Sequence, residues 1–263
     1  MATILKQEFK LNLKNLLIWS FIVGGLGYIC IMLYSSMGDE MAEMADKFSN
    51  MGAFSDAFGM STLSIATLPG FFATEVGTVH GLGSAMFAAI LATCILSKEE
   101  DGHTGEFLYS LPVSRGGVVT AKALTVLINL ILFTVICGAL YILGFVCLGE
   151  DILWKEMLIF MGSMLLMNIE IGSICLLISA MSTKNRFAIG LGVALLSYGY
   201  DIMGRVLKNL KNYLFIGPYS YANASEIFSG KAAPDFSIII AATVIIITIA
   251  ATYYIYTKRD LAS

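Results

Sequence analysis

Charged residues are scarce in this chain of 263 residues. Asp, Glu, Lys and Arg together make up 13% of it, compared with about 25% in soluble globular domains. Hydrophobic residues account for 57%, and the mean hydropathy is +0.80. No water-soluble fold can bury so large an apolar fraction. The net charge of −3 is small and says little about partners, and no basic patch indicates a nucleic-acid partner.

The motifs of several common enzyme sites are also missing. No G-x-x-x-x-G-K-[ST] phosphate loop occurs, so we expect no ATP hydrolysis by that route. G-x-S-x-G is absent as well. His80 and His103 are the only histidines, and without an H-E-x-x-H pattern a zinc hydrolase is not expected. The sequence therefore predicts no enzyme, with no catalytic residue and no metal or cofactor bound by this chain.

A disulfide framework is not expected either. All five cysteines fall inside apolar runs, where a free thiol behaves as a small hydrophobic side chain. They are Cys30, Cys94, Cys137, Cys147 and Cys175.

The long apolar runs themselves define the fold class. Crossing a hydrocarbon core of about 30 Å takes ~20 helical residues. Six runs are long enough, at about 16–36, 76–96, 124–147, 157–181, 187–207 and 237–257. Backbone groups in lipid must be hydrogen-bonded within the protein, and the ~10-residue alternation of a membrane barrel is absent. We predict an all-α polytopic protein with six transmembrane helices in one domain, residues 1–263.

The positive charges predict the orientation, because cytoplasmic loops are enriched in Lys and Arg. Three lysines precede the first run, which usually dominates the orientation. With the N-terminus inside, ten of the 16 Lys and Arg residues lie on the cytoplasmic side. These ten are Lys6, Lys10, Lys14, Lys98, Arg115, Lys122, Lys184, Arg186, Lys258 and Arg259. Six spans return the C-terminus to the cytoplasm, so we expect both termini there.

The segment before the first span is amphipathic. One helical face carries Leu5, Phe9, Leu13 and Leu16, and another carries Lys6, Lys10 and Lys14. This pattern is typical of a helix that lies along the inner membrane surface. The lysines are also explained as a topology signal alone, and both interpretations stay open.

Two outer segments are too apolar for plain loops. Residues 60–72 are interrupted by Pro69-Gly70, which suggests a re-entrant or interfacial piece before the second span. Residues 208–236 contain Pro218-Tyr219-Ser220-Tyr221 followed by a second apolar patch at 222–228.

Polar residues within the spans are functional hypotheses, since a charge there costs about 2.5–3.5 kcal/mol on insertion scales. Glu170 lies about 16 Å from the inner end of the fourth run, at mid-membrane. It is either a hydrogen-bonded packing residue beside Asn168 or a residue that faces a substrate path. Asp201 and Arg205 lie one helical turn apart and can neutralise each other, which favours a structural pair.

Close helix packing is indicated at one place. Gly77 and Gly81 form the chain's only G-x-x-x-G, which would let another helix approach the outer end of the second span.

The strongly polar stretch between the second and third spans carries the most specific signal. It reads SKEEDGHTGEFLYSLPVSRGGVVTAK, from Ser97 to Lys122. Its acidic cluster, its G-H-T-G-E and its L-P-V-S-R resemble the loop between the second and third spans of ABC-2 type ABC transporter permeases. The six spans, the Pro-Tyr outer element and the final Tyr-rich span extend this resemblance over nearly the whole chain.

The resemblance implies that the short helix at about 105–111 is a coupling helix, which sits in a groove of an ATPase. Thr104 would cap its N-terminus, and Pro112 would stop it. The residues implied at the ATPase interface are Glu99, Glu100, Asp101, Glu106, Phe107, Leu108 and Arg115. The alternative is that the loop is only a solvated connector.

It also implies the partners. Family members work as two permease subunits or domains with two separate ATP-binding cassette subunits, which bind ATP and Mg. We therefore expect a multi-pass protein of the cell membrane that pairs with a second copy or a paralogous permease. Its expected substrate is hydrophobic or amphipathic, such as a drug, a peptide or a lipid, and is exported. An ATPase-independent secondary transporter or channel, and a membrane scaffold or sensor subunit, are the alternatives.

Overall fold

The computed structural model describes residues 1–49, 51–110, 112–231 and 235–259. Within these ranges every element is helical and no strand occurs. The longer helices are α1 (Ala2–Ser49), α4 (Gly77–Ile95), α7 (Arg115–Leu148), α8 (Trp154–Met181), α9 (Phe187–Val206) and α12 (Asp235–Lys258). The shorter helices are α2 (Ala53–Phe58), α3 (Leu68–Phe71), α5 (Lys98–Asp101), α6 (Gly105–Ser110), α10 (Lys208–Lys211) and α11 (Ala224–Phe228).

Six stretches are long and apolar enough to cross a membrane. They are Ala2–Met37, Leu68–Ile95, Arg115–Leu148, Trp154–Met181, Phe187–Val206 and Phe236–Lys258. The predicted all-α class with six spans is therefore confirmed. That residues 1–263 form one domain stays a prediction.

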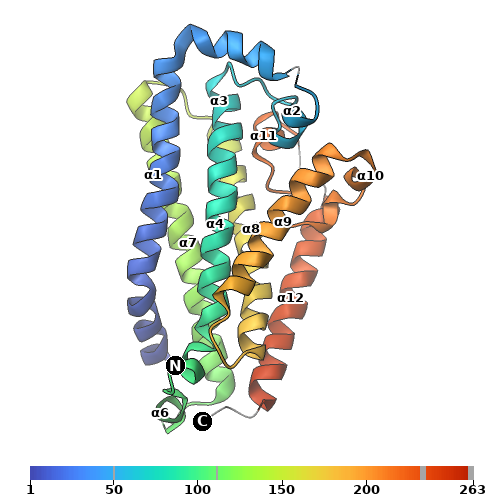
Figure 1. Ribbon diagram of the computed structural model, residues 1–263. Helices are drawn as coiled ribbons and strands as arrows, with labels where there is room; N and C mark the ends of the chain where they lie inside the picture. Colours follow the sequence, from blue (N-terminus) through green and yellow to red (C-terminus); the bar gives the residue numbers. More distant parts are fainter. Residues whose placement is uncertain (50, 111, 232–234, 260–263) are drawn as a thin grey trace.

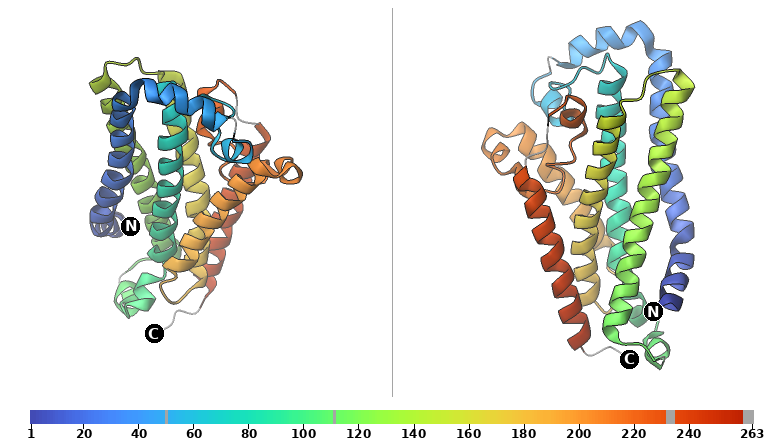
Figure 2. Two further views of the ribbon diagram at one scale, coloured as in Figure 1. Left: turned by 45° about the horizontal axis from the view of Figure 1, so that its top comes forward. Right: turned by 180° about the vertical axis from the view of Figure 1, so that it is seen from behind.

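The spans form a bundle whose ends differ. Met1, the end of α12 and the short helices α5 and α6 lie at one end, called here the loop end (Figure 1). At the opposite end, the far end, α2, α3, α10 and α11 gather (Figures 1 and 2). An even number of spans places both termini at the same end, as the six runs predict.

The bundle is held together around α4 and α8. These two helices pack against each other, α9 packs on α4, and α12 packs on α8, while α1 runs along α7. In the most apolar stretch of 18 residues of each span, 61% of the residues are buried in the spans that contain α4 and α8. The share is only 22% in α9 and 17% in α12. The last two spans therefore present most of their apolar surface outward.

Helix α1 differs from the prediction of a separate interfacial helix. It is continuous over 48 residues, about 70 Å at 1.5 Å per residue, and so exceeds a hydrocarbon core of about 30 Å. Its first part continues the span, with Ile4, Glu8 and Leu16 buried in the bundle. Its last part bends across the far end toward α2 (Figures 1 and 2). The lysines Lys6, Lys10 and Lys14 remain exposed on the other face.

The second span begins earlier than the sequence indicated. Pro69 lies in the first turn of α3, where its missing N–H costs no hydrogen bond. The side chain of Thr67 caps this turn by accepting a bond from the Gly70 N–H at 3.3 Å. A π-helical segment, Phe72–Val76, joins α3 to α4. Pro69-Gly70 therefore starts the span and does not interrupt a re-entrant piece.

The segment between α9 and α12 is broken and folds back into the bundle. After α10 and a 3₁₀ turn at Leu214–Ile216, Tyr219 and Tyr221 are both buried, as are most residues of α11. Helix α11 packs on α8, on α3 and on the π-helical segment. Residues 217–228, called here the fold-back segment, thus fill the far end between α4 and α8.

Candidate functional site

The polar loop between α4 and α7 projects from the loop end as two short helices (Figure 1). His103 joins them in a left-handed backbone conformation, with φ 53°. Helix α6 ends at Ser110, shortly before Pro112, as a proline requires. The Thr104 hydroxyl donates back to the Glu99 carbonyl at 3.4 Å, and the cap of α6 by its side chain stays a prediction. Ser114 does cap the next helix, α7, through the Gly117 N–H at 3.1 Å.

Among the loop residues whose side chains are described, the exposed ones are the tip, residues 101–104, together with Ser110, Pro112 and Ser114. Asp101 is the only one of the implied interface residues that is exposed among those whose side chains are described. Leu108 is partly buried and packs against the core of the bundle. The side chains of Glu106 and Phe107 lie outside the described residues, as does all of Leu111.

Glu99 points into the bundle. Its Oε1 pairs with the Lys122 Nζ at 2.5 Å, and that ammonium also meets the Glu8 Oε1 at 3.1 Å and the Ile95 carbonyl at 2.5 Å. Lys122 is 0% exposed, and a buried cation is stable only when it is paired in this way. Lys98 binds the other Glu8 oxygen at 2.5 Å. Burial holds the pKa of the Glu99 carboxyl above its usual value, although the neighbouring Lys122 ammonium opposes this shift.

Glu100 and Arg115 also make contacts within the chain. The Glu100 carboxylate pairs with the Arg259 guanidinium at the end of α12, and Glu100 is 6% exposed. The Arg115 guanidinium donates to the carbonyls of Thr257 at 3.3 Å and Arg259 at 2.5 Å. Glu99 and Glu100 are therefore turned away from the surface on which the resemblance placed them. The sequence could not predict this inward direction, because a helix of four residues is too short for its polar and apolar positions to distinguish a buried face from an exposed one.

Glu170 and Asn168 are both buried in α8. The Glu170 Oε2 accepts a hydrogen bond from the Tyr221 hydroxyl at 2.6 Å. This bond ties the fold-back segment to the centre of the bundle. In the part of the chain that the structure describes, neither amide atom of Asn168 has a hydrogen-bond partner. Neither residue lines the cavities described below.

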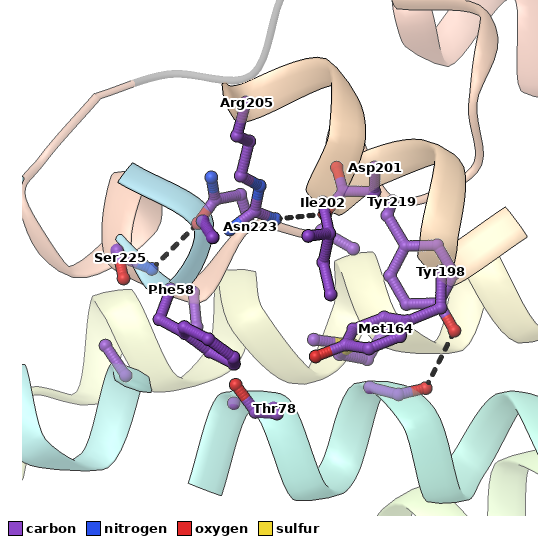
Figure 3. A pocket seen from close by; sticks show the side chains of 16 residues that line it. Phe58, Thr78, Met164, Tyr198, Asp201, Ile202, Arg205, Tyr219, Asn223 and Ser225 are labelled. Atoms are coloured by element: carbon purple, nitrogen blue, oxygen red, sulfur yellow. Dashed lines mark hydrogen bonds and ion pairs between the residues drawn. The ribbon is translucent and has the colours of Figure 1, made fainter. Parts of the chain in front are cut away.

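Asp201 and Arg205 form the expected ion pair near the far end of α9. The Asp201 side chain is 5% exposed. The pair lines a small cavity of about 30 Å³. Figure 3 shows Asp201 and Arg205 together with Tyr198 of the same helix, and Tyr219 and Met164 also line this cavity. Both residues also line a larger cavity of about 500 Å³ at the far end, called here the far-end cavity. Its other polar residues include Asp56, Lys211, Asn223 and Glu226.

The G-x-x-x-G of α4 receives the fold-back segment. A Cβ on Gly77 would lie 2.6 Å from the Cβ of Ala224, and one on Gly81 would lie 3.5 Å from the Tyr219 ring. The Tyr219 hydroxyl donates to the Gly81 carbonyl at 3.2 Å (Figure 3). The element that approaches these glycines thus belongs to the same chain.

A further cavity, of about 380 Å³, lies between α1, α4 and the start of α9 and is called here the loop-end cavity. One part of its lining is polar, with Asn12, Asn15, Lys98 and Asn185. The other part is apolar and includes Trp19, Phe87, Ile90, Leu91 and Phe187. Sequence reasoning missed this site, because it assembles from three distant segments. The only local signal was two asparagines at the edge of an apolar run.

Comparison with models of protein families gives a match over nearly the whole chain. A family model described as ABC-2 family transporter protein matches residues 2–261. No curated protein matches the chain.

Proposed function

The chain belongs to the ABC-2 family of transporter membrane proteins, and from this we propose that it is the permease of an exporter driven by a separate ATP-binding subunit. The match over residues 2–261 carries the proposal, because it covers all six spans and the polar loop. The permease is the membrane component of such a transporter and has no ATPase domain. Hydrolysis, with ATP and Mg, takes place on the partner.

The ATP-binding subunit contacts the exposed tip of the loop in this proposal. Asp101, His103 and Thr104 are exposed at the end of the bundle, next to α6. A short projecting helix with charged neighbours gives orientation and specificity in a partner's groove. Glu99, Glu100 and Arg115 lie beneath this surface, because their side chains form ion pairs and hydrogen bonds with other residues of the same chain.

The loop end is cytoplasmic in this proposal. The lysine-rich start of α1, the end of α12 and the polar loop lie there (Figure 1), and positive charge marks the cytoplasmic side. The protein then spans the cell membrane with its far end outside.

A second permease, either another copy or a paralogue, completes the transporter. Large apolar side chains on two outer helices support such a contact, among them Leu196 of α9 and Ile246 of α12. The remaining apolar surface faces the lipid bilayer.

The loop-end cavity supports the proposed substrate class. Its amides and the Lys98 ammonium suit a polar head, and its aromatic and aliphatic wall suits an apolar body. An amphipathic molecule from the inner leaflet fits both parts. This supports export of amphipathic compounds such as lipids, drugs or peptides.

A charge reversal at the loop tip tests the proposed ATPase contact. Asp101→Lys should reduce recovery of the ATP-binding subunit when the tagged permease is purified in mild detergent. Asp151→Lys is the matched control, since Asp151 is exposed at the far end, and it should leave recovery unchanged. Equal recovery with both variants would make the loop tip a solvated connector.

A further inference from the structure

Two arginines at the loop end each cap a helix that is not their own. The Arg259 guanidinium, just beyond α12, donates to the carbonyls of Ala180 at 2.7 Å and Ser182 at 3.0 Å, at the end of α8. The Arg115 guanidinium, at the start of α7, donates to two carbonyls at the end of α12. The last carbonyls of a helix lack partners within the helix, and a cation there is favourable. These contacts fasten the end of α12 to α7 and α8.

Glu100 connects this group of contacts to the polar loop. It lies in α5, and its buried carboxylate pairs with Arg259. The residues Glu100, Arg115 and Arg259 are called here the clasp. Through the clasp, a displacement of α5 acts directly on the end of α12.

Helix α12 is otherwise attached mainly along one side. It packs chiefly on α8 and less on α7, and most of its apolar residues face outward. At the far end, Phe236 and Ser237 of α12 line the far-end cavity together with Asp201 and Arg205. Helix α12 runs from the loop end to the far end of the bundle (Figure 2), so it connects the clasp with the wall of the far-end cavity.

We propose that Glu100, Arg115 and Arg259 are positioning residues that transmit movement of the polar loop through α12 to the far-end cavity. The inference rests on the proposed function in one respect, namely that the ATP-binding subunit moves the loop. A displacement of α12 changes the wall formed by Phe236 and Ser237, and thereby the opening of the cavity on the outer side.

The first test needs no ATPase. Glu100→Gln and Arg259→Gln each break the clasp, and Arg259→Gln also removes the bonds to Ala180 and Ser182. The double variant should therefore lower the thermal midpoint of the purified permease no further than Arg259→Gln alone. Non-additivity of this kind is the signature of residues in direct contact. Additive shifts would show that the two residues act separately and would overturn the clasp.

The second test follows the movement itself. Spin labels at Lys211 and Ile238, both exposed at the far end, report their separation in a reconstituted complex that is otherwise free of cysteine. We expect trapping with ATP and vanadate to shift this distance in the parent complex. The shift should be lost in Glu100→Gln and Arg259→Gln, although the ATP-binding subunit is still recovered, and kept in the control Asp151→Asn, since Asp151 is exposed and lies outside the clasp and the polar loop.

The two tests separate the possible failures. A distance shift that survives in both clasp variants, or no shift in the parent complex, contradicts transmission through α12. If no ATP-binding subunit binds, the proposed function fails, and the additivity test still decides whether the clasp exists.

Discussion

At the scale of single residues, the acidic cluster of the polar loop serves the interior of the protein. Glu99 neutralises Lys122, which is shared with Glu8 of α1. Buried ion pairs contribute little net stability compared with apolar residues, but removing one partner is costly because a buried charge is left unpaired. The cluster therefore fixes the position of the loop against α1 and α7.

Replacing Lys122 tests this role. Lys122→Met leaves Glu8 and Glu99 facing each other without the buried cation, so we expect a loss of about 3–5 kcal/mol. The loss would appear as a lower thermal midpoint in detergent. Lys155→Met is the control, because Lys155 is exposed, and it should change stability by less than about 0.5 kcal/mol. Similar midpoints for the two variants would rule out a structural role for the buried cation.

Glu170 gives a second prediction at this scale. Glu170→Gln retains an acceptor for the Tyr221 hydroxyl, so stability and substrate-stimulated ATP hydrolysis should stay near the parent values. Tyr221→Phe removes the donor from a buried carboxylate and should cost about 1–3 kcal/mol. Thermal denaturation and hydrolysis assays on the reconstituted complex measure both effects. Altered substrate stimulation in Glu170→Gln, at unchanged stability, would instead place this carboxylate on the transport path.

At the scale of helices and loops, hydropathy predicted the number of spans but not their limits. Apolar length decides whether a segment crosses the membrane, and six runs met that condition. Local signals then misled in two places. The amphipathic pattern of residues 4–17 suggested a separate helix, yet no proline occurs in α1 and the helix is continuous. Pro69-Gly70 suggested an interruption, although a proline is equally suited to a first helical turn.

The contact between α4 and the fold-back segment gives an element-scale prediction. Gly77→Ala places a methyl group 2.6 Å from the Cβ of Ala224, so the fold-back segment must shift, at a cost of about 1–3 kcal/mol. Gly162→Ala is the matched control in α8, because no atom lies within 4 Å of its added Cβ. We expect a lower thermal midpoint only for Gly77→Ala. Equal tolerance at both sites would show that the segment does not need this close approach.

At the scale of the whole molecule, the sites depend on contacts between distant segments. The clasp joins residues 100, 115 and 259, and the loop-end cavity joins α1, α4 and α9. A single sequence identifies charged and polar residues in each segment, but it does not say which of them meet. For this reason the polar loop was found from its composition, whereas the cavities and the inward direction of Glu99 and Glu100 were not.

Topology is the prediction that concerns the whole chain. Single cysteines at Asp101 and Lys211, in an otherwise cysteine-free protein, should react differently with a membrane-impermeant thiol reagent. We expect Lys211→Cys to be labelled in intact cells and Asp101→Cys only after the membrane is opened. Labelling of Asp101→Cys from outside would reverse the orientation and remove the loop from the reach of a cytoplasmic ATPase.

The most direct measurement is ATP hydrolysis by the sample obtained when the tagged permease is purified from its own membrane in mild detergent. We predict that a separate ATP-binding subunit is recovered with it and that the sample hydrolyses ATP in a vanadate-sensitive manner. Reconstituted vesicles should then transport an amphipathic probe only when ATP is present. Purification of an intact permease without an ATPase, together with probe transport in the absence of ATP, would contradict the proposal and identify a secondary transporter.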